Sequence, residues 1–270
     1  MDLITTGTAI IVGKKLLGKT FDVVSADIAN LYEKGRDKII EKATKKISDV
    51  NDGKSSNLRV TRDVFWNGSF TDESICAEYF GGILASSRSE DGKDDNGVYY
   101  VDLIKSLSSN QLKLHYLIYH AFNKYFSSHG SEKNLNPGQE SELSAKSIFL
   151  CTNELLAAIK GGDFGRDLHA IRAKGLIGDF EAKAYPLKNQ ETLPYLKVSP
   201  KPLGVQLYAV AYNKIDQWRD FAITDFGSFD SVISPKFCEN SMEKLLEVTG
   251  IKTDEDSQNA TNNDLNNITV

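Results

Sequence analysis

The most specific chemical spacing lies near the start of the chain, where Gly13–Thr20 has the sequence GKKLLGKT. It matches the phosphate-loop pattern G-x-x-x-x-G-K-[ST]. In that pattern Gly13 and Gly18 shape the loop, Lys19 contacts the β- and γ-phosphates of a nucleotide, and Thr20 holds Mg²⁺. However, two leucines occupy the middle of the motif, and no apolar run elsewhere ends in a Mg²⁺-holding Asp. We therefore favour a helical lead-in and keep nucleotide binding as the weaker alternative.

The other reactive residue types do not form a catalytic pattern. His115 and His120 lie five residues apart, off any common helical face, so we expect them, with His129 and His169, to be packed or surface side chains. The acidic loop Ser87–Gly97 lacks the alternating order and closing Glu of a calcium loop. We find no Ser-His-Asp set and no paired carboxylates. The sequence predicts no catalytic residue, metal or cofactor, and favours a protein that is not an enzyme.

The stretch Asp163–Tyr212 combines a helix with a predicted hairpin. The helix ends at Gly175, a residue type that commonly terminates helices. Two extended segments follow, Leu176–Ala184 and Leu193–Ser199, joined by a polar loop. A second helix is then expected, with Ser199 as its cap and Pro200 at its first position. This order predicts the second half of a winged-helix unit, with a small β-hairpin as the wing.

Basic residues in this unit form a candidate nucleic-acid-binding set: Arg166, His169, Arg172 and Lys174 on the helix, with Lys183 and Lys188 on the wing. A recognition helix in the major groove and a basic wing on phosphates would use such residues. Acidic residues share the same surface: Asp163, Asp167, Asp179 and Glu181. Because winged helices also bind proteins, we favour protein interaction and keep a DNA-binding regulator as the alternative.

The predicted fold is mainly α, a helical bundle followed by the winged-helix-like unit. We expect helices over Phe21–Ile47, from a cap at Thr71, over Ser109–Phe126 after a Ser108/Gln111 capping box, over Leu143–Lys160 and over Asn240–Thr249. Leu58–Phe70 is expected to be extended or irregular. The expected organisation is a lead-in (1–56), a helical core (57–130), a winged-helix-like domain with a C-terminal helix (143–250) and a disordered tail (251–270).

Composition limits the classes of function. The chain has 270 residues and a net charge of −5, which argues mildly against general binding to nucleic acid or anionic membranes. No apolar run is long enough for a transmembrane helix. The three widely spaced cysteines suggest neither a disulfide framework nor a metal site, so we expect reduced thiols in a cytoplasm.

Two blocks resemble the Abi-alpha family. Val60–Phe122 contains DVFWNGSFTDESICAEYFGGILASS followed by YYVDLIKSLSSNQLKLHYLI, and is similar to the centre of that family. The later block GLIGDF…LKVSPKPLGVQLYAVA is similar to its "GLI … LT-x-x-G" ending, although two prolines in Ser199–Pro202 depart from it. The resemblance covers most of residues 20–212. The family is associated with abortive infection by phage and has no established biochemical activity. The resemblance implies antiviral defence in bacteria through a protein partner or a homo-oligomer.

Overall fold

The computed structural model describes residues 19–251, except residues 72, 131–133, 160, 188–190 and 231. The described residues fall into two compact units that meet in sequence between Val101 and Asp102, called here the N-terminal and C-terminal units. Helices dominate both, and every described strand pair is antiparallel, so the prediction of a mainly α protein is confirmed. Among the described residues, none of the helices combines the length and apolar composition needed to span a bilayer.

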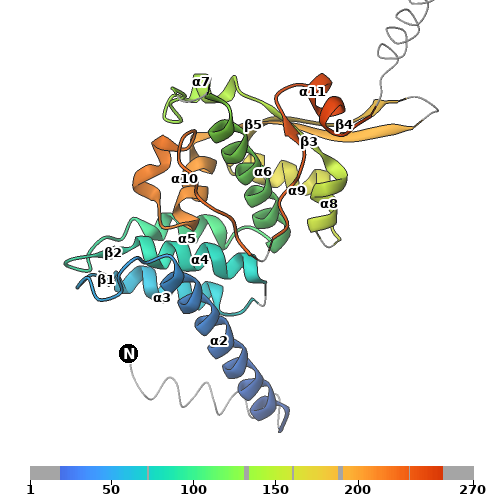
Figure 1. The fold of residues 1–270 in the computed structure, drawn as a ribbon. Coiled ribbons are helices and arrows are strands. Elements are labelled where there is room, and N and C mark those ends of the chain that lie inside the picture. Colours follow the sequence, from blue (N-terminus) through green and yellow to red (C-terminus); the bar gives the residue numbers. More distant parts are fainter. Residues whose placement is uncertain are drawn as a thin grey trace, which may run out of the picture. The chain divides into compact units, whose positions relative to one another are not determined.

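The N-terminal unit is built around a buried helix. Its elements are α2 (Lys19–Lys45), β1 (Ser55–Ser56), α3 (Leu58–Gly68), α4 (Ser74–Ser86), β2 (Arg88–Ser89) and the start of α5 (Gly97–Ile104). Helix α4 is buried along most of its length and packs against α2 and α3 (Figure 1). Gly81 allows the close approach to α2, because a Cβ there would lie 2.9 Å from the backbone nitrogen of Ala43.

Two sequence predictions in this unit need correction. Residues 58–68 form helix α3, not an irregular segment, because the Asn57 side chain accepts hydrogen bonds from the amides of Arg59 and Val60 and starts the helix. Helix α4 begins at Ser74 with Glu73 as its N-cap, and Thr71 is not that cap. The Thr71 hydroxyl instead accepts from the Glu73 amide in the preceding turn.

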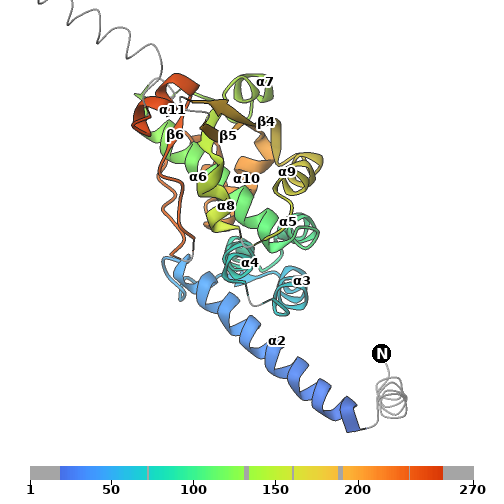
Figure 2. The ribbon, with the colours of Figure 1, turned by 90° about the vertical axis from the view of Figure 1, so that its right-hand side faces the viewer.

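The C-terminal unit is built around α6 (Ser109–Ser128), which runs through it with α9 (Phe164–Ala173) and α10 (Pro202–Ala211) beside it (Figures 1 and 2). The predicted capping box at Ser108 and Gln111 is confirmed, since both reciprocal hydrogen bonds are present. The aromatic stripe on α6 packs with rings from α10 and the segment after it. The largest fully buried rings in this packing are Tyr116, Tyr119, Phe122 and Phe126 of α6, Tyr208 of α10, and Phe221 from the segment after it.

A four-stranded sheet completes this unit, in the order β4-β5-β3-β6. The strands are β3 (Ile148–Cys151), β4 (Ile177–Pro186), β5 (Thr192–Pro200) and β6 (Cys238–Glu239). The expected hairpin is therefore present as β4 and β5. Helix α11 (Met242–Val248) confirms the predicted last helix, and its Leu245 and Leu246 pack with Leu193 and Tyr195 of β5.

Residues 143–160 do not form one helix as predicted. They form the end of α7 (Glu140–Ser144), the strand β3 and the helix α8 (Thr152–Ala158). Ile148 and Leu150 are fully buried on one side of β3, and the strand pairs with β5, which lies far along the chain. This distant pairing overrides the local helical pattern.

The helix after the hairpin starts later than predicted. Pro200 still belongs to β5, where it pairs with Ile177, and Pro202 opens α10. The Tyr119 hydroxyl accepts the hydrogen bond of the Lys201 amide at 2.9 Å. A buried tyrosine on α6 therefore contacts the backbone at the junction between strand β5 and helix α10.

Candidate interaction surface

The predicted basic set on α9 faces solvent. The helix begins with Asp163, whose carboxylate accepts a hydrogen bond from the Arg166 amide, and buries Leu168 and Ile171. Arg166, His169, Arg172 and Lys174 are exposed. Gly175 has a φ of +71°, the left-handed conformation that ends the helix, as its position in the sequence predicts.

Acidic residues of the same unit pair with part of this set. The Arg172 guanidinium lies 2.6 Å from the Asp179 carboxylate at the start of β4. Lys183 lies 2.9 Å from Glu181 on the same strand. The His169 ring meets the edge of Phe180 with ring centroids 5.0 Å apart. The geometry therefore joins α9 and β4 into one surface on which charges of both signs are adjacent.

Two basic residues on this surface have no acidic partner among the described residues, namely Arg166 and Lys174. Lys188 lies outside the described residues. Asp167, by contrast, is buried and accepts a hydrogen bond from the Gln111 side chain, so it holds α9 against α6. Within the described part of the predicted DNA-binding set, Arg172 and Lys183 thus have their charges offset by a neighbouring carboxylate, whereas Arg166 and Lys174 do not.

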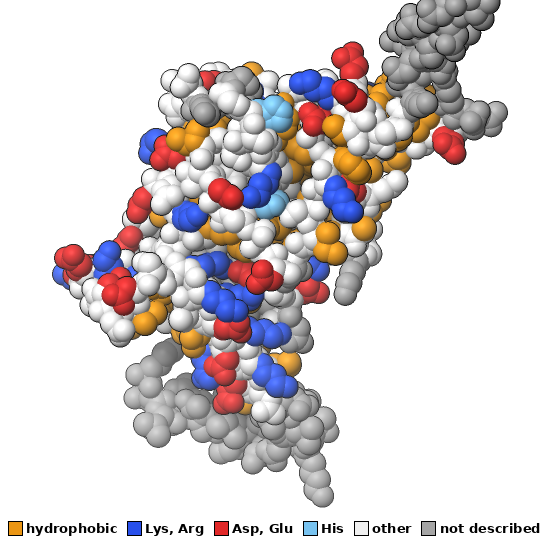
Figure 3. Space-filling view, viewed as in Figure 1, with side chains coloured by type: hydrophobic (Ala, Val, Ile, Leu, Met, Phe, Trp, Pro, Cys, Tyr) orange, Lys and Arg blue, Asp and Glu red, His pale blue; other side chains and the backbone are white. Residues whose placement is uncertain are grey.

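Glu181 contacts a polar or charged side chain on each strand of the hairpin, Lys183 on β4 and Tyr195 on β5. The Tyr195 hydroxyl donates to its carboxylate at 2.5 Å, and this bond together with Lys183 lowers the pKa of Glu181. The same bond raises the pKa of Tyr195. Glu181 is therefore a fixed negative charge at neutral pH. Figure 3 shows acidic and basic side chains interspersed over the face in view, with neither kind forming a continuous field.

The buried histidines are bound into the core and cannot act as catalytic bases at a surface. The Nε2 atom of His115 lies 3.1 Å from the Gly204 carbonyl, to which it must donate, and burial lowers the pKa of His115 to about 3. His120 lies 3.2 Å from the Tyr208 hydroxyl, and burial, with Lys124 nearby, lowers its pKa to about 4. Both imidazoles are neutral at physiological pH.

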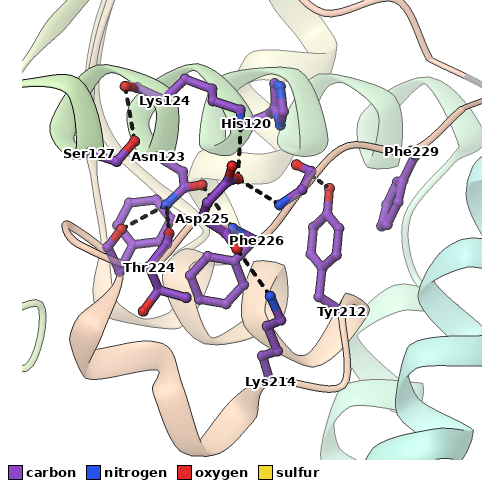
Figure 4. Close-up of polar contacts among 12 residues, drawn as sticks. His120, Asn123, Lys124, Ser127, Tyr212, Lys214, Thr224, Asp225, Phe226 and Phe229 are labelled. Atoms are coloured by element: carbon purple, nitrogen blue, oxygen red, sulfur yellow. Dashed lines mark hydrogen bonds and ion pairs between the residues drawn. The ribbon is translucent and has the colours of Figure 1, made fainter. Parts of the chain in front are cut away.

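Figure 4 shows the polar contacts near His120, which join α6 to the segment after α10. The buried Asn123 amide donates to the carbonyls of Phe221 and Thr224, at 2.7 and 2.8 Å. The Asp225 carboxylate pairs with Lys124 at 2.8 Å and accepts from the Gly227 amide. These bonds hold the segment after α10 against α6 and do not form a site with a free nucleophile or acid.

Neither a metal site nor a phosphate loop gains support from the described residues. No group of three or more His, Cys, Asp or Glu side chains that could hold an ion occurs in the described part of the chain. Gly13 and Gly18 lie outside the described residues. Lys19 and Thr20 are the first residues of α2, and the antiparallel sheets differ from the strand–loop–helix setting of a phosphate loop.

Sequence reasoning found the residues of this surface but missed their pairing. Glu181 and Lys183 are two positions apart in a strand, a spacing that places both side chains on one face of the sheet. That period-two signal was available in the sequence. The contact of Arg172 with Asp179 requires the turn at Gly175 and could not be deduced from local pattern.

Comparison with protein-family models, with curated proteins and with solved structures yields no match to this chain.

Proposed function

We propose that this chain is an antiphage defence protein of the abortive-infection type that acts through protein contacts, with α9 and the β4–β5 hairpin as its contact surface. The observation that supports contact with protein is the mixed charge of this surface. Arg172 is paired with Asp179, and Lys183 with Glu181. Such alternating charge suits a protein partner, where complementary charges set specificity, better than a polyanion.

The order of elements supports a winged-helix-like arrangement of this unit. Along the chain α6 is followed by the short helix α7 and then by β3, α8, α9, β4 and β5, and β5 lies between β4 and β3 in the sheet. In this arrangement α9 would be the recognition helix and the hairpin the wing. Winged helices bind either DNA or protein, so the arrangement alone does not choose between them. The defence role rests on the resemblance of two sequence blocks to the Abi-alpha family.

The test is infection of cells that express the chain with its native genetic neighbours. Abortive infection predicts protection at a low ratio of phage to cells and early collapse of the culture at a high ratio. The variant Arg166→Glu/Lys174→Glu changes exposed charges on the contact surface and is expected to lose protection. Lys244→Glu, an exposed change on α11 outside that surface, is the control and is expected to keep protection. No protection against a broad phage panel would reject the proposed role.

A DNA-binding regulator is the second candidate, favoured by one observation: Arg166 and Lys174 are exposed and have no acidic partner among the described residues. DNA binding would weaken steeply as salt rises, because phosphate contacts release counterions. The double variant Arg166→Glu/Lys174→Glu would then reduce both the affinity and its salt dependence in gel shifts. Absence of binding at low ionic strength rejects this candidate.

A further inference from the structure

Strand β4 lies at one edge of the sheet with β5 as its neighbour. Ala182, Lys183 and Ala184 are consecutive and exposed. The hairpin projects from the side of the C-terminal unit in Figure 1. An exposed edge strand of this length presents unpaired backbone groups to which another strand can add.

The hydrogen-bonding pattern identifies which backbone groups face outward. The Leu187 amide donates to the Glu191 carbonyl at 2.9 Å, at the end of the β4–β5 ladder. Hydrogen-bonded positions alternate along an antiparallel pair, so residues 185, 183 and 181 bond to β5. The N–H and C=O groups of Phe180, Ala182 and Ala184 therefore point away from β5. Pro186 lies two residues after Ala184, so its backbone nitrogen also points away from β5. A proline at this position therefore removes no hydrogen bond between β4 and β5.

We propose that β4 pairs with β4 of a second copy of this chain, antiparallel and centred on Ala182. This inference rests on the proposed function, because it names one partner for the contact surface. In this register the two Ala182 residues exchange hydrogen bonds, and Phe180 pairs with Ala184 of the second copy in both directions. The outward backbone groups of this segment are then satisfied. The register shift between Ile177 and Phe180 limits the pairing to the segment beyond it.

Charge complementarity selects this register and this partner. A two-fold axis at Ala182 places Glu181 of each copy directly opposite Lys183 of the other. These residues form a non-hydrogen-bonded pair, the arrangement in which cross-strand side chains come closest. Both project on the same face, and within one chain they already lie 2.9 Å apart. A lysine ordinarily protects an edge strand from pairing, but here its opposite position is a carboxylate.

The first test is a charge exchange measured by sedimentation over a range of protein concentrations. The wild-type chain is expected to form dimers. Glu181→Lys and Lys183→Glu each place like charges opposite one another twice, and each should raise the dimer Kd about tenfold or more, equivalent to about 1.4 kcal/mol. A mixture of the two variants restores both opposite-charge pairs and should form a heterodimer. Recovery in the mixture excludes misfolding as the reason that each variant fails alone.

The second test removes the backbone bond at the centre. Ala182→Pro deletes an N–H that points away from β5, so the hairpin keeps its own ladder and dimerisation is lost. Ala182→Ser keeps that N–H and should dimerise like the wild-type chain. Circular dichroism of both variants checks that the fold is retained.

A wild-type chain that stays monomeric at every concentration would overturn the inference, as would dimers that neither Ala182→Pro nor the charge variants weaken. Both outcomes are independent of the infection assay. A monomer that still protects cells would reject the strand pairing and leave the defence role standing. A dimer that gives no protection would support the strand pairing and reject the defence role.

Discussion

The Nδ1 atom of His120 lies 3.2 Å from the hydroxyl of Tyr208, and both side chains are buried in the core of the C-terminal unit. Earlier on the same helix, His115 donates to the Gly204 carbonyl. Burial keeps both imidazoles neutral by lowering the pKa of His115 to about 3 and that of His120 to about 4. These histidines join α6 to α10 as uncharged polar groups.

Acid should therefore weaken the C-terminal unit. The folded pKa of each buried histidine lies below the unfolded value of about 6.5, so the unfolded chain binds more protons between these values. For both histidines the stabilising effect is fully present above pH ~6.5 and is lost as pH falls, down to about 4 for His120 and about 3 for His115. Each histidine contributes a slope of up to about 1.4 kcal/mol per pH unit. Urea unfolding of the full chain from neutral pH down to pH ~4.5 measures this slope.

The variant His115→Gln/His120→Gln isolates the histidine contribution. It is less stable at neutral pH, but its stability should fall less steeply with acid, since neither side chain can take up a proton. His169→Gln, an exposed change on α9, is the control and should keep the wild-type slope. An unchanged slope in the double variant would show that other groups cause the acid sensitivity.

Gly204 is expected to tolerate no side chain. A Cβ at this position would overlap the Leu176 carbonyl and the Tyr119 hydroxyl, at the point where α10, α6 and the start of β4 meet. Because one obstacle is backbone and the other is a buried ring, Gly204→Ala should cost about 1–3 kcal/mol or more. Gly165→Ala on α9 meets only the Asp163 side chain at 3.5 Å and should be neutral or slightly stabilising. Chemical denaturation compares the two variants, and equal stabilities would contradict the close packing at this junction.

Asn123 should be required to hold the segment after α10. Its amide donates to two carbonyls, those of Phe221 and Thr224, and its side chain has no exposed surface. Asn123→Ala leaves both carbonyls without this partner and should destabilise the unit by about 1–3 kcal/mol for each that stays unsatisfied. Limited proteolysis should then cut near residues 221–230 sooner than in the wild-type chain. Ser127→Ala removes an exposed hydroxyl from the same helix and should leave the cleavage rate unchanged.

The elements that sequence predicts well are those defined by local chemistry. The capping box at Ser108 and the helix end at Gly175 each depend on residues within one helical turn. The two strands of the hairpin depend on the residue pattern within each strand. Strand β3 was missed because it forms through pairing with β5, about fifty residues later. Helix α3 was missed because its N-cap, Asn57, ends a polar stretch that has the composition of a linker.

In the candidate site, too, local sequence identifies the residues but not the contacts between separate elements. The exposed basic residues of α9 could be identified by their type and spacing, and so could Glu181 and Lys183 as neighbours on one strand face. Their neutralising contacts could not, since Arg172 meets Asp179 across a turn and Tyr195 reaches Glu181 from the opposite strand. Charge pairing on a surface depends on geometry that brings separate elements together, so the sequence could show that acidic and basic residues share this face but not which of them pair.

A buried carboxylate in the N-terminal unit gives the last prediction. Glu78 on α4 is 5% exposed and pairs with two ammonium groups from the end of α2 and the residue after it, Lys42 at 2.6 Å and Lys46 at 2.5 Å. Burial lowers the pKa of Lys46 to about 8, although the carboxylate opposes this shift. Glu78→Gln removes the carboxylate that offsets the burial of these two groups. The loss of stability should reach about 3–5 kcal/mol, as when one partner of a buried ion pair is removed.

The pH dependence distinguishes this cause from a simple packing defect. A lysine whose folded pKa is depressed releases its proton in the folded chain more readily than in the unfolded chain, where lysines titrate near 10.4. Stability therefore rises with pH from about 8 toward 10, and removal of Glu78 lowers the Lys46 pKa further and starts the rise at a lower pH. Hydrogen exchange of the α4 amides in the full chain measures this unit separately. Glu41→Gln breaks an exposed pair with Lys45 and should leave the exchange unchanged, whereas a Glu78→Gln deficit that does not diminish in alkali would contradict the electrostatic explanation.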